Sequence, residues 1–157
     1  MKTNTASWFK IILFIFISMS FTSCHYIENC KNRVEDKNEA EKITNQFYEL
    51  VKQDNFSKTY NLFSNKFFSV TDTVKLNNIF RTTNEKLGAI DSIKLYNWET
   101  AIIKGTVEKS NYFLQYKVKR KKFNSKETFI LTKEKGIVKI IGFNVSSDGL
   151  FAPEKKQ

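Results

Sequence analysis

Apolar residues in the first half of the chain recur at helical spacing. The sequence predicts a first helix from Asn38, which forms a capping-box pattern with Glu41, to Asp54-Asn55, where polar turn residues end it. The apolar positions of this helix fall on one face of a 3.6-residue period: Ala40, Ile43, Phe47, Leu50 and Val51. We therefore expect the helix to pack on a core through that face.

Two further helices are predicted before the pattern changes. A longer one begins at Asp72, a favourable N-cap residue, and stops at Gly88, the residue type that most often follows the end of a helix. Its apolar face consists of Leu76, Ile79, Phe80, Thr83 and Leu87. Between the two longer helices, a short helix opens at Phe56-Ser57, and its apolar residues are Tyr60, Leu62 and Phe63.

After Gly88 the apolar period changes to two, which is typical of β-strands. We expect strands over residues 90–107, 112–121, 128–132 and 137–145, with a bend or bulge in the first near residues 97–100. Helices followed by an antiparallel meander define an α+β fold, here three N-terminal helices on one face of a curved antiparallel sheet of about four strands. The predicted core contains Ile43, Phe47, Phe63, Phe80, Leu114, Tyr116, Phe129 and Ile140.

The last strands carry a more specific pattern. The strand Tyr112 to Lys121, the charged start Lys126-Glu127-Thr128-Phe129, and Gly136-Ile137-Val138-Lys139-Ile140-Ile141-Gly142-Phe143 resemble the closing hairpins of small exported proteins. Those proteins belong to the nuclear-transport-factor-two-like (cystatin-like cone) superfamily. The resemblance implies a cone-type domain over residues 36–146. It leaves the activity open, because this fold carries enzymes, binding modules and assembly domains.

Residues 1–23 have the order of charged, apolar and small residues that is typical of a secretory signal peptide. Lys2 and Lys10 precede an apolar run from Ile11 to Ile17, and small residues follow at positions 20, 22 and 23. The apolar run is shorter than the ~20 residues that a membrane-spanning helix needs. We therefore expect this segment to direct export and to be cleaved.

Phe21-Thr22-Ser23-Cys24 resembles the lipobox of bacterial lipoproteins, with Phe21 where Leu is usual. The resemblance implies that Cys24 receives a diacylglyceryl group and becomes the first residue of the mature protein. Cleavage after Ser20 would instead allow Cys24 and Cys30 to form a disulfide in an oxidising compartment. Residues 24–35 are expected to be a tether, and residues 147–157 a flexible tail.

The residue after Cys24 is His25, not the Asp that favours inner-membrane retention in the lipoproteins it resembles. We therefore expect a protein of the cell envelope that is held to the membrane through Cys24. In a cell with two membranes, the expected place is the outer membrane, facing the periplasm.

Composition adds a strong positive charge to this picture. Of the 26 Lys and Arg residues only Lys2 and Lys10 precede Cys24, whereas all 16 acidic residues follow it, so the mature side chains carry a net charge of +8. Such charge fits anionic lipid, glycan or an acidic partner, and nucleic acid is not expected beside an exported domain. The alternative is a lysine-rich face that protects a sheet edge. The charge is densest at Lys117, Lys119, Arg120, Lys121, Lys122 and Lys126.

Catalysis through His is not expected, because the only His in the chain, His25, lies outside the predicted domain. For the same reason we expect no metal and no cofactor. A cone-type acid–base enzyme would need a pocket carboxylate and a Tyr, for which Glu127 with Tyr116 is the candidate pair and Glu99 a further carboxylate. The simpler interpretation places Glu127 at a strand end, facing water or paired with a Lys. Residues that could line a ligand pocket are Phe47, Tyr60, Phe80, Tyr112, Tyr116 and Phe129.

These observations favour a non-catalytic envelope lipoprotein whose small domain binds a protein or an apolar ligand. The alternatives are an isomerase-like or dehydratase-like cone enzyme, and a periplasmic inhibitor or immunity protein. An enzyme requires a carboxylate at the bottom of an open cavity, whereas a binding module requires only an exposed groove or sheet face. The surroundings of Glu127 therefore distinguish these hypotheses.

Overall fold

The computed structural model describes residues 28–104 and 109–153. The predicted signal peptide, Cys24 and His25 lie outside the described residues, as does part of the predicted tail. The helices are α2 (Val34–Lys52), α3 (Phe56–Thr59), α4 (Asn65–Phe68) and α5 (Thr73–Leu87), with short 3₁₀ turns η2 (Tyr60–Leu62) and η3 (Asp148–Leu150). The strands are β1 (Glu28–Lys31), β2 (Ile90–Lys104), β3 (Lys109–Arg120), β4 (Ser125–Glu134) and β5 (Ile137–Ser146).

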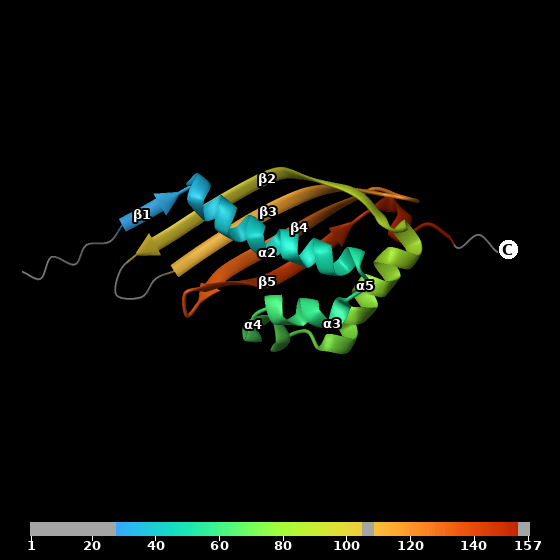
Figure 1. Ribbon diagram of the computed structural model, residues 1–157, viewed down its shortest axis with the longest axis horizontal. Coiled ribbons are helices and arrows are strands. Elements are labelled where there is room, and N and C mark those ends of the chain that lie inside the picture. Colours follow the sequence, from blue (N-terminus) through green and yellow to red (C-terminus); the bar gives the residue numbers. More distant parts are fainter. Residues whose placement is uncertain (1–27, 105–108, 154–157) are drawn as a thin grey trace, which may run out of the picture.

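The predicted α+β class is confirmed. The strands form one antiparallel sheet in the order β1-β2-β3-β4-β5, and helices cover one of its faces. In Figure 1 the sheet arches over α2, and the segment from α3 to α5 lies below α2. Strand β1 and the C-terminal end of the described chain lie at opposite ends of the molecule (Figure 1).

The sheet has five strands, not four. The fifth, β1, lies within the segment predicted to be a tether, and it pairs with the far end of β2 from Glu28↔Lys104 to Lys31↔Ala101. Cys30 is its one buried apolar residue, so the strand has no alternating pattern that the sequence could display. Asn32 then reverses the chain with a positive φ of 50°, and its side chain accepts a hydrogen bond from the Thr100 backbone.

The first long helix also begins earlier than predicted. Helix α2 starts at Val34 instead of near Asn38. Asp36 in its first turn is buried and accepts two hydrogen bonds of 2.8 Å from the Arg33 guanidinium. Because a carboxylate is favourable near the N-terminal end of a helix dipole, Asp36 stabilises the added turn. The structured domain therefore includes residues 28–35.

Aromatic rings fill the space between α2 and the sheet. The Phe47 ring lies 5.5 Å from that of Phe80 and 5.1 Å from that of Phe129, in edge-to-face arrangements. Seven of the eight predicted core residues are buried, and Ile43 is half-buried. Ile79, placed on the apolar face of the last helix by its spacing, is instead 41% exposed, since the buried face of α5 is narrower than predicted. The buried residues of α5 are Leu76, Phe80, Thr83 and Leu87.

The ends of α5 agree with the sequence prediction. The Asp72 carboxylate accepts a hydrogen bond from the Lys75 N–H at 2.7 Å, and Gly88 follows the helix with a φ of 80°. The short helix predicted from Phe56-Ser57 is divided, however, into α3 and η2, and a further short helix, α4, follows it. Phe63 is extended between the last two and makes a parallel bridge to Ile140, which ties this segment to β5.

Two further differences concern β2 and the chain end. Strand β2 has register irregularities between Ile90 and Ser92 and between Leu95 and Asn97, and the second lies slightly before the range predicted for the bulge. Residues 147–150 pack on the domain instead of forming a free tail, since Gly149 is buried against Phe123 and Lys86 donates a hydrogen bond of 2.7 Å to the Leu150 carbonyl, whereas Phe151 is 88% exposed. No helix within the described residues has the length and apolar character needed to cross a membrane.

Candidate functional site

The space between helices and sheet, where a cone-type pocket was expected, is almost completely filled. The cavity found there has a volume of about 10 Å³, which is about one water molecule. Phe47 and Phe80 line it, whereas Phe129 is fully buried among other rings. Within the part of the chain that the structure describes, these residues form a packed core and do not surround a ligand-sized space.

Each of the three tyrosines predicted to line a pocket has a hydrogen-bond partner. The Tyr116 hydroxyl lies 2.5 Å from the Thr44 hydroxyl, and burial raises the pKa of Tyr116 to about 12. Tyr112 donates to the Glu39 carboxylate at 3.1 Å. Tyr60 is half-buried at the surface and donates to the Thr73 carbonyl at 3.5 Å. The hydroxyls of Tyr112 and Tyr116 join α2 to the sheet, and that of Tyr60 joins η2 to α5.

Glu127 occupies the core, in contrast to the expected water-facing strand end. Its side chain is 1% exposed, and its partner is an arginine, not a lysine. Arg120 donates from Nη2 at 2.8 Å and from Nε at 3.3 Å, both to Oε1 of Glu127. Ser125 donates to the same oxygen at 2.9 Å. The negative charge of the carboxylate is therefore compensated by the Arg120 guanidinium inside the protein.

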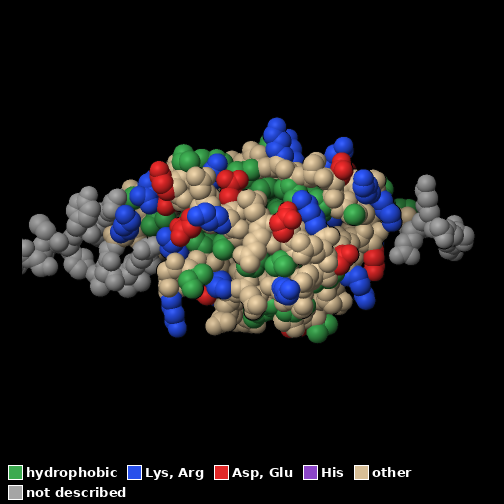
Figure 2. Space-filling model, viewed as in Figure 1, with side chains coloured by type: hydrophobic (Ala, Val, Ile, Leu, Met, Phe, Trp, Pro, Cys, Tyr) green, Lys and Arg blue, Asp and Glu red, His purple; other side chains and the backbone are tan. Residues whose placement is uncertain are grey.

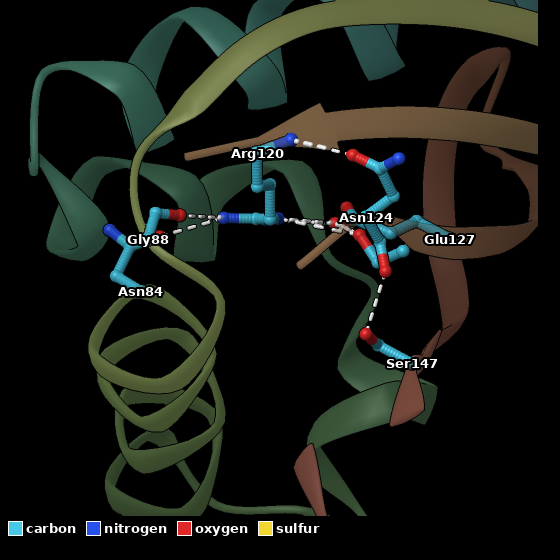
Figure 3. A network of polar contacts seen from close by, with 7 residues as sticks. Asn84, Gly88, Arg120, Asn124, Glu127 and Ser147 are labelled. Atoms are coloured by element: carbon cyan, nitrogen blue, oxygen red, sulfur yellow. Dashed lines mark hydrogen bonds and ion pairs between the residues drawn. The ribbon is translucent and has the colours of Figure 1, made fainter. Parts of the chain in front are cut away.

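The Arg120 guanidinium links the hairpin to α5. Besides Glu127 it donates to the Asn84 side chain at 3.0 Å and to the Gly88 carbonyl at 3.2 Å. Figure 3 shows the guanidinium between the end of α5 on one side and Glu127 on the other. Both charged residues continue the inward-facing alternation of their strands, Arg120 after Val118 and Glu127 before Phe129. This alternation of inward-facing and outward-facing positions was the signal in the sequence that both side chains would be buried.

Tyr48 is a further member of this cluster that sequence reasoning missed. It is 1% exposed, and its hydroxyl makes no hydrogen bond within the described residues. Burial, followed by the negative charge of Glu127, raises the pKa of Tyr48 well above its ordinary value near 10. The hydroxyl therefore stays protonated at neutral pH. Its helical position, directly after Phe47, gave no indication that it would face Glu127.

Acid–base chemistry has no open site in this cluster. Glu127 is covered on all sides and held by Arg120, so a substrate would have to displace the guanidinium to reach it. Glu99, the other candidate carboxylate, is exposed on the outer face of the sheet, opposite Phe113 of β3. It does not lie beside any of the predicted pocket residues.

The outer face of the sheet, which the helices leave uncovered, carries a row of lysines. Lys94 of β2 is opposite Lys117 of β3, Lys117 is opposite Lys126 of β4, and Lys126 is opposite Ser146 of β5. We call Lys94, Lys117 and Lys126 the lysine row. All three side chains are exposed. Figure 2 shows Lys and Arg side chains projecting from the upper margin of the molecule, which the sheet forms in Figure 1.

The lysine row lies in an open hollow of about 580 Å³. Hydroxyl and amide groups surround the ammonium groups, and Asp148 is the one carboxylate that lines the hollow. The complete lining consists of Ser92, Lys94, Lys117, Val118, Lys119, Asn124, Ser125, Lys126, Ser146, Ser147 and Asp148. The hollow is thus polar and predominantly basic.

Neighbouring lysines on this face differ in their partners. The carboxylate of Asp91 lies 3.1 Å from the Lys119 ammonium and 3.7 Å from that of Lys121, and the bond from Lys119 lowers the Asp91 pKa. Within the described residues, no carboxylate lies at ion-pair distance from Lys94, Lys117 or Lys126. The Lys117 ammonium is instead 4.1 Å from the centre of the Tyr96 ring.

The edge-protection interpretation of the basic hairpin does not fit this topology. Lys117, Lys119 and Lys126 lie on β3 and β4, which are interior strands with neighbours on both sides. Arg120 of the same cluster points into the core.

Comparison with protein-family models, with curated proteins and with solved structures finds no match for this chain.

Proposed function

We propose that this protein is a non-catalytic, lipid-anchored binding domain of the cell envelope, which binds its ligand on the outer face of its sheet. The observation that supports this proposal best is the difference in volume between the interior cavity and the hollow on the outer face. The interior cavity has about 10 Å³, whereas the outer hollow has about 580 Å³. An apolar ligand inside a cone-type pocket is therefore a poorer interpretation than a polar ligand outside.

The state of Glu127 argues in the same direction. A general base must come within hydrogen-bond distance of the proton that it removes. Glu127 already accepts three hydrogen bonds from Arg120 and Ser125, in a core without room for a substrate. The pair is better explained as a structural link between the β3–β4 hairpin and α5.

The proposed anchor, Cys24, precedes the start of β1 by four residues. Four residues span at most ~14 Å when fully extended. A diacylglyceryl group on Cys24 would therefore hold the β1 end of the domain close to the membrane surface, and the opposite end would carry the β3–β4 hairpin (Figure 1). Attachment to the outer membrane, facing the periplasm, remains part of this proposal.

Metabolic labelling with a fatty acid tests the anchor. We expect label in the wild-type protein and in Cys30→Ala, and none in Cys24→Ala, which should be soluble or arrested as a precursor. Cys30→Ala is a suitable control because it alters a cysteine six positions away, inside β1. A wild-type protein without label would contradict the lipoprotein assignment.

Native mass spectrometry of the protein purified from envelopes in a neutral detergent tests the binding mode. We expect the mass of the acylated chain without a stoichiometric small apolar ligand, because the interior has room for about one water. A 1:1 complex with an apolar molecule that persists in the Cys24→Ala protein would contradict binding on the outer face and support a cone-type pocket.

A further inference from the structure

We infer that the hollow on the outer face is a binding site for a phosphorylated ligand, with the lysine row as its charged element. This inference deepens the proposed function, on whose binding role it rests, by naming the site and the chemical class of the ligand. The site itself does not depend on the lipid anchor, whereas the choice between a soluble ligand and a lipid headgroup does.

The register brings the three ammonium groups together. Lys94, Lys117 and Lys126 are direct neighbours on three adjacent strands. Adjacent strands lie about 4.8 Å apart, so the row spans about 10 Å at the backbone. Lysine side chains are long enough to converge from that width on one phosphate group, or to contact two linked phosphates separately.

The lysine row is unfavourable for the sheet when the site is empty. Like charges directly opposite each other on neighbouring strands destabilise a sheet. Asp91 relieves this repulsion for Lys119 and Lys121, but it reaches no member of the row. Asp148 lines the hollow as well, but within the described residues no carboxylate lies at ion-pair distance from the row, and three such cations are the arrangement that an anionic ligand would complement.

The remaining groups of the hollow favour phosphate over a carboxylate. The hydroxyls of Ser92 and Ser146 and the side chain of Asn124 add uncharged donors around the row. A phosphate monoester offers up to two negative charges and three acceptor oxygens, whereas a carboxylate offers one charge and two oxygens. Lysine binds phosphate as a mobile point charge, without the planar geometry of an arginine fork. The volume of about 580 Å³ exceeds a single phosphate and leaves room for the group that carries it.

The buried ion pair fixes the hairpin that carries the site. Arg120 binds Glu127 and the end of α5, and its backbone N–H donates to the Asn124 side chain at 3.3 Å. Ser147 donates to the Asn124 carbonyl at 2.6 Å, which attaches the chain after β5 to the same turn (Figure 3). The strands bearing Lys117 and Lys126 are therefore held in place before a ligand binds, which lowers the cost of binding.

A phosphate group could come from a lipid headgroup or from a soluble molecule. Lys117 lies eight residues along β3 from Lys109, which is at the β1 end of the sheet, and this corresponds to about 26 Å. With the anchor at the β1 end, an upright domain would hold the row well above its own membrane. We therefore expect a soluble phosphorylated molecule, and the experiment separates the two sources.

The first arm is a calorimetric titration of the full-length protein in neutral detergent with pyrophosphate, at an ionic strength of about 0.15 M. The test variant is the triple substitution Lys94→Gln, Lys117→Gln, Lys126→Gln. The matched control is Lys42→Gln, Lys58→Gln, Lys66→Gln, which changes the net charge equally through exposed lysines on the helices. We expect pyrophosphate affinity to fall at least tenfold in the test variant and less than twofold in the control. Cooperative thermal unfolding of both variants near or above the wild-type temperature would exclude misfolding, and Lys117→Thr alone serves if the triple variant unfolds.

The second arm measures amine labelling of the three lysines, by mass spectrometry, in vesicles of phosphatidylcholine with or without phosphatidylglycerol. Protection of the row by pyrophosphate alone would support a soluble ligand. Protection by phosphatidylglycerol alone would support the site but assign it to headgroups. Equal loss of affinity in test and control variants, or no protection by either probe, would overturn the inference. Fatty-acid labelling at Cys24 is independent of both arms, so failure of the site and failure of the anchor are distinguishable.

Discussion

Positively charged side chains on the two faces of the β3–β4 hairpin differ in burial and in their partners. On the inner face, Arg120 is 2% exposed and is bound by a carboxylate, a side-chain amide and a backbone carbonyl. On the outer face, Lys117 and Lys126 are exposed, and within the described residues no carboxylate lies at ion-pair distance from either. A buried charge must be compensated within the fold, whereas an exposed one remains available to a ligand. The same strands thus separate a structural cation from candidate binding cations.

The largest effect is expected from removing the structural cation. Arg120→Met leaves Glu127 in the core without its guanidinium partner, and such loss of one member of a buried pair costs about 3–5 kcal/mol. Urea unfolding would measure the loss. Lys119→Met is the matched control on the same strand, and it should barely change stability because Lys119 and Asp91 are exposed. A loss below about 1 kcal/mol in Arg120→Met would mean that the pair is not sealed in the core.

Core packing below the hairpin gives the next comparison. Phe80→Ala should cost about 3–5 kcal/mol, because its ring is buried against Phe47 and Phe143. Ile79→Ala, one residue earlier on α5, should cost less than about 1 kcal/mol, since Ile79 is 41% exposed. Equal losses in the two variants, measured by thermal or urea unfolding, would show that the buried face of α5 is assigned wrongly.

Two buried tyrosines should respond in opposite directions to loss of the hydroxyl. Tyr48→Phe should stabilise the fold by about 1 kcal/mol, because it removes a buried hydroxyl without a hydrogen bond. Tyr116→Phe should destabilise it by about 1 kcal/mol, because it removes the hydrogen bond to Thr44. The difference in free energy of unfolding between the two variants is the measurement, and a loss of stability in Tyr48→Phe would contradict it.

The same tyrosines predict the alkaline behaviour. The pKa of Tyr116 is raised to about 12 and that of Tyr48 is raised as well, so the folded state holds both phenolic protons more tightly than the unfolded chain. The contribution of Tyr116 is therefore complete below about pH 10 and is lost as the pH rises toward 12, and that of Tyr48 also begins to decline above about pH 10. Urea unfolding at pH 9 to 11.5 should show this decline in the wild type and a shallower one in Tyr116→Phe. If the free energy of unfolding fell with the same slope against pH in both proteins, a raised pKa of Tyr116 would be contradicted.

The smallest effect concerns the lysine row without ligand. Lys117→Thr should raise stability by a few tenths of a kcal/mol, since it removes the central member of two like-charge cross-strand pairs. Thermal unfolding in phosphate-free buffer would measure the gain. Phosphate should raise the unfolding temperature of the wild type more than that of the variant, because a ligand that binds only the folded state stabilises it. If phosphate raised the unfolding temperature of Lys117→Thr as much as that of the wild type, Lys117 would not contribute to phosphate binding.

Much of this architecture was predictable from local patterns. The two long helices and four strands follow from apolar periods of 3.6 and 2, and Asp72 and Gly88 mark the ends of α5 by their own chemistry. Strand β1 was not predictable, because its only buried apolar residue is Cys30, and its pairing with β2 is a contact between distant segments.

The candidate site was predictable only in part. The density of lysines near residues 117–126 was visible, but the site also needs Lys94 and Ser146, which lie beside these lysines through the register across four strands. Glu127 and Arg120 were both named from the sequence, yet their pairing depends on how the two strands of the hairpin are aligned. Alternation alone gives the face of each side chain and not its partner.

The most direct test of the central claim is to map where pyrophosphate acts on the full-length protein by NMR, through changes in the chemical shifts of backbone amides and lysine side chains. We predict the largest changes at Lys94, Lys117, Lys126 and Ser146, with little change at residues around the interior cavity. Changes concentrated at Phe47, Tyr48, Glu127 and Phe143, with the lysine row unaffected, would contradict binding on the outer face and indicate the space between the helices and the sheet as the functional site.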